Sequence, residues 1–138
     1  KLCGVTINHN PLVGHSDADV GYHAICDSIL GSLSLRDIGF YFKTNDKRWK
    51  NIDSLHFVKF CKRQLDEKNY KISNIDINFI CETPNINKYV KKMKKNISKA
   101  LKIKDNIISI KATTNEKVSF IGQGKAIAAE SVVQIKND

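Results

Sequence analysis

The sequence contains only three arginines among its 23 basic residues, so its net charge of +9 is carried almost entirely by lysine. Proteins that read nucleic acids rely on arginine for bidentate contacts to guanine and phosphate. The scarcity of arginine therefore argues against a nucleic-acid-binding protein. A chain this basic still suits partners that carry phosphate groups, but most of the lysine is interpreted as a solvated surface.

Long hydrophobic runs are also missing. No segment approaches the ~18 consecutive apolar residues of a membrane-spanning helix, so we expect no membrane partner. Cys3, Cys26, Cys61 and Cys81 show no Cys-x-x-Cys spacing, and their neighbours are apolar. They are predicted to be buried free thiols in a reducing compartment, which excludes a disulfide framework and a cysteine zinc site.

Internal repeats, low-complexity tracts and linkers are absent from the 138 residues, so we expect one domain over residues 1–138. The sequence begins at Lys1 without a methionine, and we expect this domain to be truncated at its N-terminus. A domain of this size has little interior for a deep private pocket. Small enzymes of this kind often build their sites between subunits.

Hydrophobic periodicity predicts an α+β (mixed α/β) fold with one mostly four-stranded sheet covered by helices. Strands are expected at about residues 2–7, 72–80, 107–110 and 126–135. Helices are expected from an N-cap at Ser16 or Asp17 to Leu33, from Asp53 to Lys68, and from Pro84 to Lys102. Residues 34–52 are predicted to form an irregular loop.

The first predicted helix carries the main concentration of chemically active side chains. Asp19, His23 and Asp27 are spaced at i, i+4 and i+8 and share one helical face. Such a face suits a metal or a phosphate, with His23 as ligand and Asp19 or Asp27 orienting its second ring nitrogen. An exposed helix face with Asp–His pairs explains the spacing equally well. His15 lies near the helix start, where backbone amides favour an anion, or it is a plain loop histidine.

Several colinear blocks extend this pattern along essentially the whole chain. The first is His-Ser-Asp-Ala-Asp-Val-x-x-His-Ala-x-x-Asp-x-x-Leu-Gly, which begins at His15. The others are Arg36-Asp37-Ile38-Gly39 with Phe42 and Asp46, Glu82-Thr83-Pro84, Lys111-Ala112-Thr113-Thr114-Asn115-Glu116-Lys117, and Gly122-x-Gly124 with Glu130. The order and spacing of these blocks closely resemble the cyclodiphosphate synthase family.

This resemblance implies a phosphorus–oxygen lyase of the methylerythritol phosphate route to isoprenoid precursors. In the family reaction, the 2-phosphate of 4-diphosphocytidyl-2-C-methyl-D-erythritol 2-phosphate attacks its own β-phosphorus. The products are 2-C-methyl-D-erythritol 2,4-cyclodiphosphate and CMP. The resemblance also implies a homotrimer with active sites between subunits and a small-molecule substrate bearing cytidine diphosphate.

Two metal ions are implied by the resemblance. Zn²⁺ is expected on His23, together with an Asp-x-His of an N-terminal strand that would lie upstream of Lys1. Mg²⁺ or Mn²⁺ is expected on Glu116, because hard cations prefer carboxylate oxygen.

The resemblance assigns the remaining site residues by position. The catalytic residues are His15 and Thr114, which donate hydrogen bonds to phosphoryl oxygens as charge shifts. The predicted substrate-binding residues are Ser16, Asp37, Ile38, Gly39, Phe42, Asp46, Cys81, Glu82, Thr83, Pro84, Asn85, Ile86, Asn87, Thr113, Asn115, Glu116 and Phe120. Among them, residues 81–87 and 113–116 are expected to form the cytidine pocket, and Phe120 lies near the central cavity of the trimer.

The chain departs from the family at three places. Lys43-Thr44-Asn45 replaces the middle of a frequent Phe-Pro-Asp-Thr-Asp segment, and Asn115 stands where threonine is common. Gln123 stands where many members carry an arginine that faces the central cavity. Without that cation, the argument for a phosphate-bearing ligand in the cavity is weaker.

Two alternatives remain open. The lysine-rich helix from Lys88 to Lys102 suits an anion- or nucleic-acid-binding module, although Tyr89 is its only aromatic residue. A chain without Asp-x-His also suits a catalytically inactive homologue of the same fold. The abundance of Lys, Asn and Ile indicates an AT-rich genome, so we expect a plastid (apicoplast-like) location in a eukaryote and a cytoplasmic one otherwise.

Overall fold

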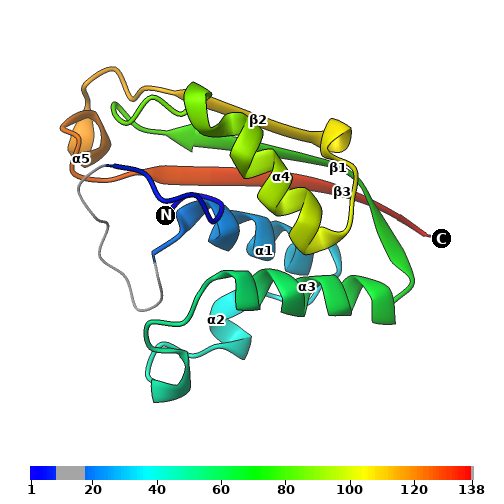
Figure 1. Ribbon diagram of the computed structural model, residues 1–138. Coiled ribbons are helices and arrows are strands. Elements are labelled where there is room, and N and C mark those ends of the chain that lie inside the picture. Colours follow the sequence, from blue (N-terminus) through cyan, green and yellow to red (C-terminus); the bar gives the residue numbers. More distant parts are fainter. Residues whose placement is uncertain (9–17, 138) are drawn as a thin grey trace.

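The computed structural model describes residues 1–8 and 18–137, and in this part of the chain a three-stranded sheet is covered by helices (Figure 1). The strand order is β2-β1-β3. The strands are β1 (Tyr70–Ile80), β2 (Ile108–Thr113) and β3 (Ala128–Asn137). The mixed α/β class predicted from the sequence is confirmed.

Strand β1 pairs in parallel with β2 and antiparallel with β3. Its alternating residues Ile75, Ile77 and Phe79 are fully buried and point to the helices, as the period of two predicts. The parallel pair ends in register, with Ile80 opposite Thr113. The loops that follow β1 and β2 therefore leave the sheet at the same edge.

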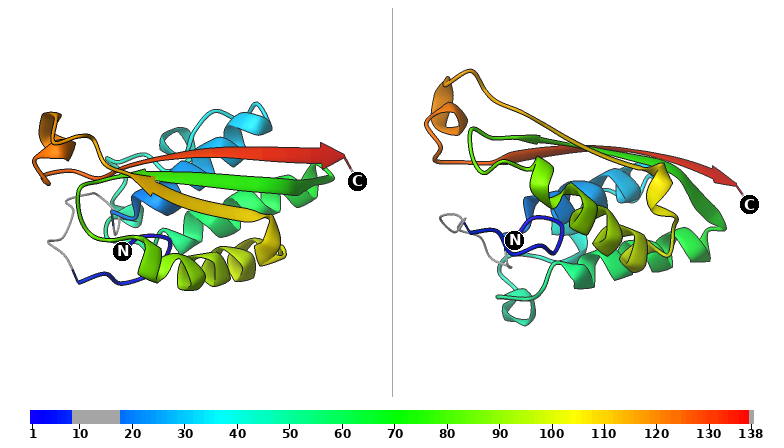
Figure 2. Two further views of the ribbon diagram at one scale, coloured as in Figure 1. Left: turned by 90° about the horizontal axis from the view of Figure 1, so that it is seen from above. Right: turned by 45° about the horizontal axis from the view of Figure 1, so that its top comes forward.

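Three helices form the second layer, and all lie on one face of the sheet (Figure 2). They are α1 (Val20–Ser32), α3 (Leu55–Glu67) and α4 (Val90–Leu101). The core positions at helical spacing are fully or almost fully buried: Ile25, Ile29 and Leu30 on α1, Phe57, Val58 and Leu65 on α3, and Met93, Ile97 and Leu101 on α4. The apolar stripes seen in the sequence are thus the faces that build the core.

The predicted strand at residues 2–7 is wrong. This segment forms a single bridge between Leu2 and Val5, and Cys3 and Gly4 have positive φ angles of 46° and 72°. The amides of Cys3 and Gly4 donate to the Asp19 carboxylate at 2.8 and 2.7 Å. Because that carboxylate takes the amides that a ladder would use, the segment turns instead of joining the sheet.

Two predicted helix starts also need correction. Helix α1 begins at Val20 with Asp19 as its N-cap, whereas the predicted caps Ser16 and Asp17 lie outside the described residues. Helix α4 begins at Val90, after a short 3₁₀ turn, η2 (Asn87–Tyr89), and not at Pro84. Asn85 Oδ1 accepts a hydrogen bond from the Asn87 amide at 3.1 Å, a local turn that competes with helix formation.

The segment predicted as an irregular loop contains two short helical turns, α2 (Ile38–Tyr41) and η1 (Lys47–Trp49). Asp37 caps the first and Asp46 caps the second. Aspartate is a strong N-cap residue, so the signal for both turns was present in the sequence. The remaining short elements are η3 (Asp105–Ile107) and α5 (Ser119–Gly122).

All four cysteines are free and buried, as the sequence predicts. Burial raises the pKa of the Cys3 and Cys26 thiols well above its ordinary value, which keeps them protonated. No described helix has the length and apolar character needed to cross a membrane.

Asp76 is expected to give the protein a small pH dependence of stability. Its hydrogen bond from Lys111 Nζ, at 2.8 Å, lowers the pKa of the Asp76 carboxyl. A lowered folded-state pKa stabilises the protein above the unfolded pKa of ~3.9, and this contribution is lost as the pH falls through the folded pKa. Because the pair is partly exposed, we expect less than about 1 kcal/mol. Denaturation between pH 6 and 2 should show a shallower acid loss in Asp76→Asn and, to a smaller extent, in Lys111→Gln, which leaves the contributions of Ser109 and the Ile77 amide in place. Unchanged acid slopes in both variants would contradict this.

Candidate active site

The loops that follow β1 and β2 are joined by one carboxylate. Glu82 Oε1 accepts hydrogen bonds from the Asn115 amide at 3.1 Å and from the Lys117 amide at 3.0 Å. Beside it, the Cys81 amide donates to the Thr113 carbonyl oxygen at 3.0 Å. The structure thus brings together residues 81–87 and 113–116, the two segments predicted to form the cytidine pocket.

The second of these loops has a tightly specified backbone. Glu116 and Lys117 have positive φ angles of 51° and 59°, a conformation that L residues seldom adopt. Thr114 Oγ1 accepts a hydrogen bond from the Glu116 amide at 3.3 Å. Gly122 lies against this turn, and a Cβ atom there would come within 2.1 Å of the Lys117 carbonyl carbon. The fold therefore holds Thr114 and Glu116 on an exposed, ordered loop.

The Cys81 thiol serves packing in this site. It is almost fully buried, and its Sγ lies 3.9 Å from the Pro84 carbonyl oxygen. Burial, followed by the nearby Glu82 carboxylate, raises the pKa of the thiol. A thiol that is protonated at neutral pH is a poor nucleophile, so we interpret Cys81 as a packing residue beside Pro84.

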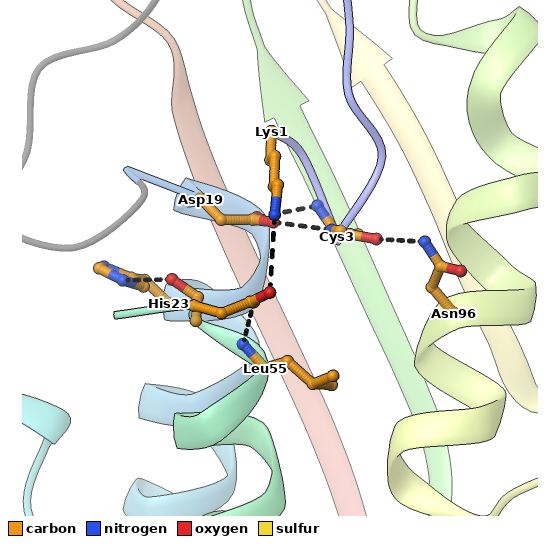
Figure 3. A network of polar contacts seen from close by, with 9 residues as sticks. Lys1, Cys3, Asp19, His23, Leu55 and Asn96 are labelled. Atoms are coloured by element: carbon orange, nitrogen blue, oxygen red, sulfur yellow. Dashed lines mark hydrogen bonds and ion pairs between the residues drawn. The ribbon is translucent and has the colours of Figure 1, made fainter. Parts of the chain in front are cut away.

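His23 occupies the first turn of α1, beside the start of α3. Its Nε2 forms a hydrogen bond with Ser54 Oγ at 3.1 Å, and its ring lies edge-on to Phe57 with 5.7 Å between centroids. Figure 3 shows His23 pointing away from the Asp19 carboxylate and from the turn at Cys3. The ring is therefore oriented in part by the hydroxyl group of Ser54, the residue that precedes α3.

Asp19 and Asp27 have structural roles that the helical spacing did not reveal. Asp19 is fully buried and accepts hydrogen bonds from three backbone amides, those of Cys3, Gly4 and Tyr22. Asp27 Oδ1 accepts from the Ile38 amide at 3.0 Å, which ties α2 to α1. Both aspartates therefore hold the backbone, and the predicted role of either one in orienting His23 stays a prediction.

The predicted residues of the α2 region are also engaged in the fold. Asp37 Oδ1 caps α2 by accepting from the Phe40 amide at 2.9 Å, and Asp46 pairs with Arg48 at 2.6 Å. Phe42 packs within an aromatic cluster whose other members are Trp49, His56, Phe57 and Phe60, with centroids 4.7–5.7 Å from its ring. Sequence reasoning missed this cluster, although His56, Phe57 and Phe60 follow helical spacing.

The predicted site residues fall into two groups that one chain does not bring together. Helix α2 and its cap lie beside α3, whereas α5 and the loops after β1 and β2 lie at the far end of the sheet (Figure 1). His23 belongs to α1, between the two groups. The predicted residues His15 and Ser16 lie outside the described residues.

A metal site is not complete in the described part of the chain. No group of three or more histidine, cysteine, aspartate or glutamate side chains gathers there in a way that could hold an ion. His23 alone supplies an imidazole of the predicted zinc set, and Glu116 alone supplies a carboxylate for a harder cation. The described residues by themselves therefore do not fit a zinc centre.

The chain matches known proteins over almost its whole length. A sequence profile of the YgbB family matches residues 1–136. The 2-C-methyl-D-erythritol 2,4-cyclodiphosphate synthase of Ehrlichia ruminantium is 44% identical over 133 residues, which cover 96% of this chain and 77% of the relative. The bifunctional IspD/IspF enzyme of Wolbachia pipientis wMel is 48% identical over 134 residues, covering 96% of this chain and 34% of the relative. This chain thus spans about a third of the bifunctional relative.

Solved structures of similar proteins also match almost the whole chain. The bifunctional IspDF of Campylobacter jejuni matches with a TM-score of 0.95 and 35% identity, covering 99% of this chain and 37% of that one. The IspF of Plasmodium falciparum in complex with CDP matches with a TM-score of 0.87 and 40% identity, covering 99% and 83%.

Proposed function

Because the chain belongs to the YgbB family, we propose that it converts 4-diphosphocytidyl-2-C-methyl-D-erythritol 2-phosphate to 2-C-methyl-D-erythritol 2,4-cyclodiphosphate with release of CMP. The observation that carries this proposal is the pair of loops joined by Glu82 at the shared edge of β1 and β2. These loops belong to a chain that superposes along its length on a relative whose structure holds CDP. The shared edge of parallel strands is also where α/β sheets commonly bind nucleotides.

The proposed reaction is intramolecular, so the protein has mainly to fold the substrate and offset its charge. Residues 81–87 and 113–116 would bind the cytidine diphosphate, and residues 37–39, 42 and 46 would border the methylerythritol part. His15 and Thr114 would donate hydrogen bonds to phosphoryl oxygens as the new P–O bond forms and CMP leaves. The broken bond links phosphorus to the oxygen of the CMP leaving group, which makes the enzyme a phosphorus–oxygen lyase.

We propose that the enzyme is a homotrimer with active sites between subunits. Two features support an assembly. The predicted site residues form two groups that lie apart in one chain (Figure 1), and the helices cover only one face of the sheet (Figure 2). Large apolar side chains also remain exposed, with Val132 of β3 and Phe120 of α5 each 70% exposed. A neighbouring subunit would cover them and complete the site.

The metal ions are proposed on the basis of donor chemistry. His23 would be one ligand of a Zn²⁺ ion whose other ligands come from outside the described residues, and Glu116 would bind Mg²⁺ or Mn²⁺. When bound, such ions supply positive charge to the phosphates. For location we propose a plastid in a eukaryote and the cytoplasm otherwise. The alternative of an inactive homologue is distinguished by the experiment below.

Phosphorus NMR of the protein with 4-diphosphocytidyl-2-C-methyl-D-erythritol 2-phosphate, Zn²⁺ and Mg²⁺ tests the proposed reaction. We expect the substrate resonances to give way to those of CMP and a cyclic diphosphate. The experiment should use the native-length protein, and CDP binding should be measured in parallel. Bound CDP with unchanged substrate would favour the inactive homologue, and CMP without a cyclic product would indicate hydrolysis.

Glu82→Ala is expected to weaken CDP binding by about tenfold to a hundredfold. The substitution leaves the Asn115 and Lys117 amides without their acceptor, which destabilises the loop conformation that binds CDP by about 1–3 kcal/mol. Glu82→Gln keeps an oxygen at the same place and should remain within a few-fold of the wild type. Isothermal titration calorimetry with CDP measures both affinities. Equal losses in the two variants would show that charge and not loop geometry matters.

A further inference from the structure

A basic cleft lies between α3 and α4, which pack against each other on the helical face of the molecule (Figure 1). Its volume is about 630 Å³. A smaller adjoining hollow of about 250 Å³ shares Lys62 and Lys102 with it. None of the predicted catalytic, substrate-binding or metal-ligating residues lines either hollow, so the cleft is separate from the candidate active site.

The charges along the cleft are strongly unbalanced. Its two carboxylates already have partners, since Asp53 pairs with Lys1 at 3.5 Å and Asp66 pairs with Lys62 at 2.5 Å. Four further cations line the cleft: Lys59, Arg63, Lys99 and Lys102. None of the four forms an ion pair with any described residue. The lining therefore carries four positive charges that no carboxylate of this part of the chain offsets.

The wall of the cleft next to the N-terminal turn is rigidly built. Asn96 Nδ2 of α4 donates to the Cys3 carbonyl oxygen at 3.0 Å, and Asp19 holds the amides of Cys3 and Gly4 (Figure 3). Gly4 also lines the cleft. It packs so closely against Tyr22 that a Cβ atom at this position would lie 2.9 Å from Tyr22 Oη. Leu55 and Ala100 add apolar surface. A fixed wall, apolar patches and a basic rim are features of a preformed ligand pocket.

Lys102 adds a second observation. It follows the last residue of α4 with φ 54° and ψ 47°, the left-handed position at which helices favour glycine. A residue with a side chain is less favourable than glycine in this conformation, so its presence has an energetic cost. The chain bears this cost with a lysine whose side chain lines both hollows.

We propose that the α3–α4 cleft binds a small molecule that carries a diphosphate group. The volume lies within the roughly 300–1,000 Å³ typical of small-molecule sites. A single phosphate ester carries about −1.5 to −2 charge, so two phosphate groups match four unpaired cations better than one. Lysine binds phosphate as a point charge and needs no planar fork. A nucleic-acid strand fits less well, because Tyr22, which is buried, is the only aromatic side chain among the described residues that line the larger hollow.

Amide chemical-shift titration of the isotope-labelled protein with inorganic diphosphate tests this proposal. We expect shifts at residues 59–66 and 96–102, and an affinity that falls several-fold between 50 and 200 mM NaCl. The double variant Lys59→Gln/Lys99→Gln should bind at least about tenfold more weakly. The matched double variant Lys91→Gln/Lys95→Gln removes the same charge from exposed positions of α4 outside the cleft and should bind like the wild type.

Lys102→Gly is a variant in which misfolding could not explain a loss of binding. It removes a cation of the cleft and relieves the left-handed backbone, so it should weaken diphosphate binding while raising the melting temperature. Shifts confined to residues 81–87 and 113–116 would place the diphosphate in the candidate active site and overturn the proposal. Equal losses in the two double variants would also overturn it, as would tighter binding of a random oligonucleotide through the same amides.

Discussion

Asp19→Ala is expected to lower the free energy of unfolding by about 3–5 kcal/mol, because three backbone amides lose a shared acceptor. The Asp19 carboxylate is fully buried, and it accepts from Cys3, Gly4 and Tyr22 at 2.7–3.0 Å. It joins the N-terminal turn to the first turn of α1, two segments that are not otherwise paired in a sheet. Without it, the helix loses its cap and the turn at Cys3 loses its anchor.

Chemical denaturation of the variants measures this effect. The free energy of unfolding of Asp19→Asn should lie between those of the wild type and Asp19→Ala. The amide oxygen of asparagine can still accept hydrogen bonds, but its NH₂ group is a donor and cannot replace the second carboxylate oxygen. Asp66→Ala is a suitable control, since it removes an aspartate from an exposed pair with Lys62, and such pairs contribute about 0–1 kcal/mol. A loss below about 1 kcal/mol in Asp19→Ala would show that water replaces the carboxylate.

His23→Ala is expected to abolish zinc binding and to reduce kcat/KM by at least about a hundredfold. A metal that stabilises phosphate charge contributes several kcal/mol to the transition state, and each 1.36 kcal/mol corresponds to a factor of ten in rate. The substitution also removes the hydrogen bond to Ser54 and the edge contact with Phe57. Zinc content by plasma mass spectrometry is therefore the primary readout, because it separates ligation from a general loss of packing.

His56→Ala provides the matched control. His56 stacks on Trp49 with 5.5 Å between centroids and belongs to the aromatic cluster around Phe42. Its removal should destabilise the protein through lost packing but leave the zinc content unchanged. If His23→Ala retains stoichiometric zinc, His23 is not a ligand and its role is confined to the contact with α3.

The elements with a clear hydrophobic periodicity were predicted correctly from the sequence. The predictions were wrong where a side chain accepts hydrogen bonds from backbone amides that a β-sheet or a helix would otherwise use. The stripes on α1, α3 and α4 and the alternation on β1 are confirmed because burial on one face imposes those periods. The strand predicted at residues 2–7 fails because β-propensity does not register that Asp19, far along the chain, takes two of its amides. Spacing alone cannot distinguish an N-cap from a ligand on a helix face.

The candidate site was only partly predictable for the same kind of reason. The motifs named the segments at residues 81–87 and 113–116, and the parallel register of β1 and β2 explains why they meet. The two hydrogen bonds accepted by Glu82 arise from the positive φ angles after Thr114, which no spacing rule encodes. The separation of these loops from α2 is compatible with the sites between subunits that the family resemblance implies, although no spacing rule within one chain encodes it.

The uncovered face of the sheet has a consequence for how the protein behaves on dilution. A sheet with helices on a single side leaves its other face, where Val132 is 70% exposed, open to a partner. If that partner is another copy, folding and association become linked equilibria, and the unfolding midpoint rises with protein concentration. The amount of protein that a cell makes then helps to set the fraction that is folded.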